Sequence, residues 1–482
     1  MSETRVGSRK RQAEALEEAT AIASLSSGVA GYHALGADEV ALDRLLRGLA
    51  AELPDSAVSS SFLEQKAAYD ASALLRVLRR MPKGAVLHTH GIATGDFREL
   101  ARRVRASDSK VWTYIGDDKR GFPGFLPTNT FRAQNQSPGE EWVRADTLGE
   151  DEIYRLLTLP SGLGSVEANW IEFFAIWDRL NGILGCAEFY YGRNGYMWHI
   201  LEEQWKTGVW YLEIKESIFH SLKNLNGECI SDDEWMFMFK STVEEFKEQH
   251  PGFVGARAIM TFLKLLPEDD ARQAFRRTVA LKAKYPDYIA GFDLAGPEDH
   301  PNSSMFAEMF EEERSKSKEA EQLPLMIHAG ETHVTAAQHH VEAVCMSFPG
   351  CRIGHGFALV RRPNLWPEVK QKGICLEVCP ISNQVLGYFP QLAAHPAPTL
   401  LRCGLPMTIS HDDPGIWHYS DVSYDWVAAT KAWSLNLAEI KALARNSIIY
   451  STLPSDEKAA FLSAWESAWQ GWVREALASP GE

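Results

Sequence analysis

The sequence lacks the features of a membrane-spanning or disulfide-stabilised protein. No apolar run approaches the 18 residues that a transmembrane helix needs. The N-terminal stretch MSETRVGSRKRQAEALEEA has no apolar core region and no small-residue cleavage site, which predicts a cytoplasmic protein. The seven cysteines form no CxxC pair, and their odd number favours reduced thiols.

A surplus of positive charge is also absent. The chain has 49 Lys and Arg against 64 Asp and Glu, a formal net charge of −15. This balance argues against general binding to nucleic acid or to an anionic membrane, and leaves open a small ligand in a cleft. The 482 residues are 45% hydrophobic, enough for one large core or two smaller ones.

Two regions differ from the rest of the chain. Residues 1–80 carry apolar residues at helical spacing in RQAEALEEATAIAS, ADEVALDRLLRGLAAEL and SFLEQKAAYDASALLRVLRR. They predict an N-terminal helical segment, packed on the main domain (81–475) or on a second subunit. Residues 95–165 are rich in Gly, Pro, Asn and charge, which predicts irregular chain within a long insert at about 91–165.

From residue 81 onward, short β-branched runs alternate with helical stretches. Eight such units predict a parallel (β/α)8 barrel, a TIM barrel in the α/β class. The eight predicted strands are 85–88, 208–215, 253–262, 288–296, 324–331, 352–356, 374–380 and 406–413.

Residues able to do chemistry lie where these strands end. The carboxyl ends of barrel strands converge on one pocket, so residues distant in sequence should meet there. The candidates are His88, His90, Gly296, His328, Glu331, His355, Asp412 and Asp413.

His88 and His90 are separated by one residue, so both point to the same face of a strand. Two imidazoles on one face can share a divalent ion such as zinc. An isolated pair of this kind is more often two hydrogen-bonded strand residues. The pair alone therefore leaves both interpretations open.

The other strand ends have the same ambiguity. Glu331, three residues after His328, is either a general acid or base or a solvated turn residue. His355 lies between two glycines, as turn histidines also do. Asp412 and Asp413 are adjacent carboxylates, which a cation would neutralise, or caps of a helix. Their occurrence together at one end of one barrel favours a mononuclear metal hydrolase.

Longer motifs resemble the adenosine deaminase family, and more narrowly its adenosine deaminase-related growth factor branch. The likeness covers about residues 81–475. It rests on MPKGAVLHTH, AGFDLAGPED, LPLMIHAGET, RIGHGFAL, LEVCPISNQVLGYF, ISHDDP and LARNSIIYSTLPSDEKAAF. The resemblance implies a homodimer formed through the N-terminal helices. It also implies a zinc cofactor held by His88, His90, His328 and Asp412.

The resemblance further implies roles in deaminating a 6-aminopurine. Glu331 protonates N1 of the ring, which breaks its aromaticity and makes C6 open to attack. His355 and Asp413 hold and orient the attacking hydroxide, and Asp413 also touches N7. The Gly296 N–H reaches N3, and Trp170 belongs to the substrate pocket.

Two positions depart from the family pattern. Relatives usually carry a carboxylate that helps hold the sugar one or two places after the second histidine, where this chain has Gly91 and Ile92. Relatives often have serine before the paired aspartates, where this chain has His411. These changes spare every metal and acid–base position and affect sugar recognition.

We therefore expect zinc-dependent hydrolysis of adenosine or 2′-deoxyadenosine to the inosine-type product and ammonia. A first alternative is the same chemistry on AMP, a modified adenine or another heterocyclic amine. A second is a catalytically weak binding or signalling protein. The expected partner is a small purine nucleoside or analogue, with no nucleic acid and no membrane.

Overall fold

The computed structural model describes residues 35–107, 111–114, 142–217, 222–300, 303–333, 340–342, 344–345 and 351–479. Eight parallel strands form its centre, at the eight places that the sequence predicts. They are β1 Gly84–His90, β4 Val209–Ser217, β5 Gly255–Leu263, β6 Ile289–Ala295, β7 Met326–Ala329, β8 Arg352–His355, β9 Cys375–Val378 and β10 Met407–Ile409.

The strands pair in two four-stranded sheets, β1-β4-β5-β6 and β10-β9-β8-β7. Isolated parallel bridges link the sheets at both edges, Thr89 to Asp412 and Phe292 to Leu325. The strands are buried almost throughout, as parallel strands covered by helices must be. This is the strand order expected of a (β/α)8 barrel.

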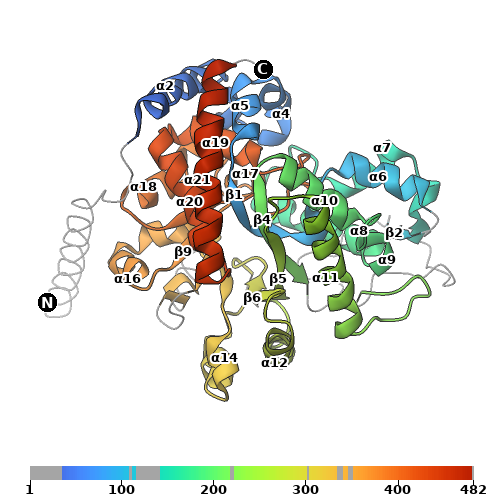
Figure 1. The fold of residues 1–482 in the computed structure, drawn as a ribbon. Coiled ribbons are helices and arrows are strands. Elements are labelled where there is room, and N and C mark those ends of the chain that lie inside the picture. The colour runs from blue at the N-terminus through green and yellow to red at the C-terminus, as the bar shows by residue number, and fades with distance from the viewer. Residues whose placement is uncertain are drawn as a thin grey trace, which may run out of the picture.

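Helices follow the strands and cover the sheets (Figure 1). Two begin with capping boxes, Ser231 with Glu234 and Asn436 with Glu439, in which side chains satisfy the first N–H groups. The helices of this part are α11 Asp232–Gln249, α12 Glu268–Lys284, α13 Ala307–Arg314, α14 Lys318–Gln322, α16 Trp366–Gln371, α17 Pro380–Val385, α18 Ala397–Arg402, α19 Ser423–Trp433, α20 Leu437–Ile449 and α21 Ser455–Ala478. The 3-10 turns are η3 Phe357–Arg361, η4 Pro363–Leu365 and η5 Leu392–Ala394.

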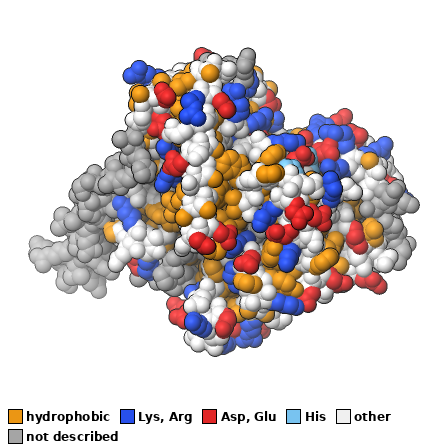
Figure 2. Space-filling view, in the orientation of Figure 1, with side chains coloured by type: hydrophobic (Ala, Val, Ile, Leu, Met, Phe, Trp, Pro, Cys, Tyr) orange, Lys and Arg blue, Asp and Glu red, His pale blue; other side chains and the backbone are white. Residues whose placement is uncertain are grey.

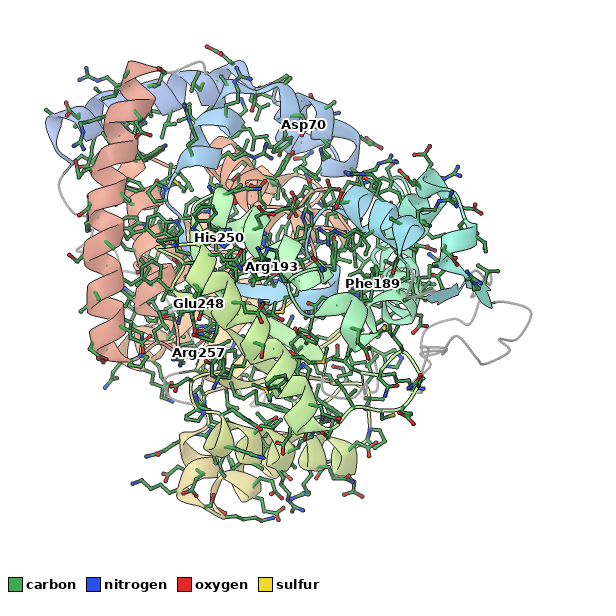
Figure 3. All side chains as sticks on the ribbon, turned by 45° about the vertical axis from the view of Figure 1, so that its right-hand side comes forward. Asp70, Phe189, Arg193, Glu248, His250 and Arg257 are labelled. Atoms are coloured by element: carbon green, nitrogen blue, oxygen red, sulfur yellow. The ribbon has the colours of Figure 1, made fainter. Side chains whose placement is uncertain are left out.

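The N-terminal helices pack on the C-terminal ones (Figure 1). They are α2 Ala37–Glu52, α3 Ser56–Ser59, α4 Phe62–Ala71 and α5 Ala73–Arg80. Glu39 of α2 accepts hydrogen bonds from Lys441 of α20 and Trp469 of α21. Asp70 of α4, labelled in Figure 3, accepts one from Tyr424 of α19. The predicted helix at 11–24 lies outside the described residues.

The connection from β1 to β4 forms a lobe beside the barrel (Figure 1). It contains η1 Gly91–Ala93, α6 Phe97–Ala106, β2 Trp112–Tyr114, β3 Trp142–Arg144, η2 Ala145–Thr147, α7 Glu150–Leu157, α8 Val166–Leu184, α9 Ala187–Tyr190 and α10 Tyr196–Lys206. Phe189, labelled in Figure 3, lies in α9. The prediction of irregular chain over 95–165 is wrong for α6 and α7. Both helices have apolar residues at helical spacing, but the many charged residues between them hide this pattern in the sequence. The Gly- and Pro-rich stretch 116–141 lies outside the described residues.

The surface mixes charges of both signs. Figure 2 shows hydrophobic side chains gathered alongside α21, where Trp205, Trp210, Phe253 and Phe461 line a groove. Within the described part of the chain, no helix combines the length and hydropathy needed to cross a membrane.

Candidate active site

Histidines from β1, β7 and β8 surround one carboxylate after β10. His88 Nε2 lies 3.1 Å and His90 Nε2 3.3 Å from Asp412 Oδ1. One ligand atom from each of His88, His328, His355 and Asp412 lies within 4.8 Å of the others. All of these side chains are buried, so the strands bring together the candidates predicted at separate strand ends.

Two further carboxylates lie behind the histidines. Glu377 Oε2 is 2.8 Å from His88 Nδ1, and Asp293 Oδ1 is 2.9 Å from His328 Nδ1. Each carboxylate accepts a hydrogen bond from the Nδ1–H of its histidine, which leaves the Nε2 lone pair for a metal. His88 Nε2 and Asp412 Oδ1 are then two acceptors facing each other at 3.1 Å, an arrangement that a cation between them stabilises. The donor set therefore fits a divalent metal such as zinc.

Buried cations hold these carboxylates in place. Arg352 Nε donates to Glu377 Oε1 at 2.6 Å, and Lys215 Nζ donates to Asp293 Oδ2 at 3.1 Å. Burial alone would raise the pKa of Glu377, but Lys215 and Arg352 hold that pKa well below its usual range. Both carboxyl groups consequently stay ionised and able to orient the histidines.

Glu377 and Asp293 are not among the functional residues predicted from the sequence, although they lie in the motifs LEVCPISNQVLGYF and AGFDLAGPED. The available signal was an acidic residue inside an otherwise apolar strand, LEVC or GFDLA. Such a residue is rarely buried without a partner.

A hydrogen-bond chain fixes the proton on His355. Burial lowers the pKa of His395 to about 3, so its ring is neutral. The Ala397 N–H donates to His395 Nδ1 at 3.1 Å, so the proton of His395 is on Nε2 and is donated to Asn383 Oδ1 at 3.1 Å. The Asn383 amide therefore donates to His355 Nδ1 at 3.0 Å.

The consequence is that neutral His355 carries its proton on Nε2. That nitrogen lies 3.4 Å from Glu331 Oε1 and 3.8 Å from Asp412 Oδ2. It faces the cluster as a donor rather than as a metal ligand. These hydrogen bonds favour His90 as the third histidine ligand and leave His355 to orient an oxygen.

Backbone strain accompanies two of these residues. His355 and Asp412 have φ values of 60° and 62°, in the left-handed region that non-glycine residues seldom adopt. Such strain persists where surrounding contacts determine the conformation, and it is common at functional sites. Ser382 Oγ contributes one contact by donating to Asp412 Oδ2 at 2.7 Å.

A pocket of about 600 Å³, measured with its open mouth, lies above the cluster. Aromatic side chains of α8 form one wall, and polar groups at the strand ends form the floor. The lining residues are His90, Trp170, Phe173, Phe174, Trp177, Asn181, Ser217, Thr261, Leu263, Ala295, Gly296, His328, Glu331, His355, Leu386, Asp412 and Asp413.

Two acidic groups of the floor have unused hydrogen-bonding capacity. Glu331 Oε1 and Asp413 Oδ1 are buried and have no hydrogen-bond partner among the described residues. Burial raises the pKa of Glu331 well above its usual value, and Asp412 adds to the effect. Burial and the neighbouring Asp412 likewise raise the pKa of Asp413. Both groups are therefore suited to present a proton to a ligand.

The structure brings all the predicted site residues to this one place. Gly296 directly follows β6, has a φ of 108° and lines the pocket. Trp170 also lines it, and its Nε1 donates to Tyr388 Oη at 3.0 Å. The sequence does not single out Trp177, Asn181 and other wall residues, because a helix that is apolar on several faces is typical of a buried core helix.

The chain matches the family model described as Adenosine deaminase over residues 160–467. It is 30% identical over 473 residues to adenosine deaminase 2 of Homo sapiens, covering 91% of this chain and 88% of that protein. It is 30% identical over 446 residues to adenosine deaminase 2 of Sus scrofa, covering 88% and 85%.

Solved structures share the fold at lower identity. An amidohydrolase from Burkhoderia ambifaria with bound Zn superposes with a TM-score of 0.60 at 17% identity, covering 84% of this chain and 95% of that one. An Arabidopsis N6-mAMP deaminase gives 0.58 at 16% identity, covering 81% and 99%.

Proposed function

The chain belongs to the adenosine deaminase family and is a hydrolytic deaminase, and we propose that it converts adenosine or 2′-deoxyadenosine and water to the inosine-type nucleoside and ammonia in a zinc-dependent reaction. The observation that carries this proposal is the cluster of histidines and Asp412 directly beneath a pocket whose floor includes buried Glu331. The cluster would supply a metal site, and Glu331 would supply an acid.

The metal site uses residues that fit it. His88, His90 and His328 would provide nitrogen ligands, and Asp412 an oxygen ligand. A zinc ion bound there would lower the pKa of water to about 7 and so supply a nucleophile near neutral pH.

The remaining residues act on the purine and on the proton. Glu331 holds a proton at its carboxyl group and donates it to N1, which makes C6 electrophilic. His355 donates from Nε2 and orients the oxygen that attacks C6. Asp413 donates to N7, a role that its raised pKa supports. Gly296 offers its N–H to N3, and Trp170 helps to close the pocket against water.

A second candidate is the same reaction on AMP, a modified adenine or another heterocyclic amine. Gly91 favours it, because the expected sugar-binding carboxylate is missing there. Cytoplasmic location and dimerisation through residues 1–80 stay predictions. Dimerisation is tested by comparing the sedimentation of the full chain with that of a chain lacking residues 1–80.

The test is formation of the 6-oxopurine product by the purified zinc-loaded protein from adenosine, 2′-deoxyadenosine, AMP, N6-methyladenosine and adenine, with release of ammonia, or of methylamine from N6-methyladenosine. We expect the highest kcat/KM for one of the two plain nucleosides. A clear preference for AMP or N6-methyladenosine would favour the second candidate. No release from any 6-aminopurine would refute the proposal.

A further inference from the structure

A second pocket adjoins the one above the metal cluster. It measures about 630 Å³ with its open mouth. Trp177, Asn181 and Ser217 line both pockets, so the second lies directly beside the pocket over the cluster. The other lining residues are Ile92, Lys215, Glu216, Leu222, Ile230, Ser231, Asp232, Trp235, Met260 and Arg277.

Glu216 enters this pocket beside Gly91. It lies near the carboxyl end of β4, one residue beyond Lys215, which pairs with His90 of β1. A Cβ atom at position 91 would lie 2.6 Å from Tyr190 Oη and 2.8 Å from Glu216 Oε1. Real Cβ atoms do not approach other atoms so closely. The glycine therefore makes room for a hydroxyl and a carboxyl group supplied by other elements.

Polar atoms around this pocket lack partners. Glu216 Oε1, Tyr190 Oη, Trp177 Nε1 and Asn181 Nδ2 are buried and have no hydrogen bond among the described residues. Glu216 and Asn181 are each only 8% exposed. Buried polar groups are normally satisfied, so several unsatisfied ones together indicate a ligand or water. Donors and acceptors occur side by side, which suits hydroxyl groups because each hydroxyl both donates and accepts.

The charges of the described lining do not suit a phosphate. Lys215 is paired with Asp293 at 3.1 Å, and Arg277 Nε with Asp232 Oδ2 at 3.0 Å. Glu216 has no cationic partner among the described residues. Burial raises the pKa of Glu216 to about 8, so near neutral pH it can donate or accept a hydrogen bond. An uncharged group bearing hydroxyls fits this lining better than an anion does.

We propose that Glu216 is a specificity-determining residue that hydrogen-bonds the sugar hydroxyls of the substrate in this second pocket. The inference rests on the proposed function and sharpens it, because it selects uncharged nucleosides over nucleotides and over the free base. In this account Glu216 takes the place of a carboxylate after the second histidine, and Gly91 provides the space.

The test compares wild type with Glu216→Met, which keeps the side-chain volume and removes the hydrogen bonds. The substrates are adenosine, 2′-deoxyadenosine, 5′-deoxyadenosine and 9-methyladenine, which has no sugar. We expect kcat/KM for adenosine to fall about 10- to 100-fold, mainly through KM, as for loss of a hydrogen bond to a polar substrate group. For 9-methyladenine the change should be about threefold or less. Glu188→Gln, at an exposed carboxylate of α9, is the matched control.

Two further measurements separate binding from structure. Calorimetric binding of inosine should weaken by a similar factor in Glu216→Met, and Gly91→Ala should reproduce the sugar-dependent loss by displacing Glu216. Equal losses for 9-methyladenine and adenosine would overturn the assignment and make Glu216 structural. Failure of wild type to act on any nucleoside would instead refute the proposed function, so the two failures are distinguishable.

Discussion

Asp293→Asn is a precise test of how the metal cluster is organised. Asp293 Oδ1 accepts hydrogen bonds from the backbone N–H of His328, at 3.0 Å, and from His328 Nδ1, at 2.9 Å. Its other oxygen faces Lys215 Nζ at 3.1 Å. An asparagine has the same shape, but its NH2 group must face either Lys215 or His328, and both are donors. The substitution therefore changes the hydrogen bonding of His328 while keeping its packing.

The expected loss is in metal affinity. Removing the carboxylate partner of a ligand histidine typically weakens metal binding about 10- to 100-fold. At about 1.4 kcal/mol for each tenfold change, this corresponds to about 1.4–2.8 kcal/mol. The acid–base residues are untouched, so kcat at saturating zinc should remain within about tenfold of wild type.

The assay is a zinc titration against a competing fluorescent chelator, followed by adenosine turnover at saturating zinc. Asp287→Asn, at an exposed carboxylate just before the same strand, is the control and should bind zinc as wild type does. Unchanged zinc affinity in Asp293→Asn, or an equal loss in the control, would refute the reasoning.

Three further predictions follow from other parts of the structure. Glu331→Gln should lower kcat about 100- to 10,000-fold with zinc content unchanged, because it removes the proton donor. Burial and nearby Asp96 raise the pKa of Glu203 to about 8 from its ordinary 4.5, so the folded state keeps a proton that the unfolded chain releases. Stability should fall as pH rises between these values, and Glu203→Gln should flatten that fall in urea unfolding. Trp469→Ala should lower the free energy of unfolding by about 3–5 kcal/mol, because it empties a buried site and removes the bond to Glu39 on α2.

Each prediction has a result that contradicts it. Near-normal turnover by Glu331→Gln would contradict the first prediction. An unchanged pH dependence of the free energy of unfolding in Glu203→Gln would contradict the second. For Trp469→Ala the contradicting result is a loss well below the expected range, with Trp198→Ala, on α10, as a comparison at a half-buried tryptophan.

The strands and the chemistry at their ends could be predicted because local sequence determines them. A short apolar run such as AVLH indicates a buried strand, and barrel topology then brings His88 to His328 and Asp412 without further information. The longer motifs around these residues then indicate which reaction the site performs, the deamination of a 6-aminopurine. The order of the strands alone is enough to place these residues together.

The rest depends on contacts between distant residues. The proton position on His355 is set by His395 and Ala397, which only the folded chain brings near it. In the sequence, Gly91 stands where relatives have a carboxylate, which suggests that this group is absent. In the structure, Glu216 of another strand lies beside Gly91. Side-chain packing across elements, which no local pattern encodes, decides both cases.

Dependence of the reaction on zinc is tested most directly by removing the metal and returning it. Purified protein should contain one zinc per chain, should lose adenosine deamination when a chelator removes it, and should regain ammonia release when zinc is added back. Sustained turnover of adenosine by protein proven metal-free would contradict the account.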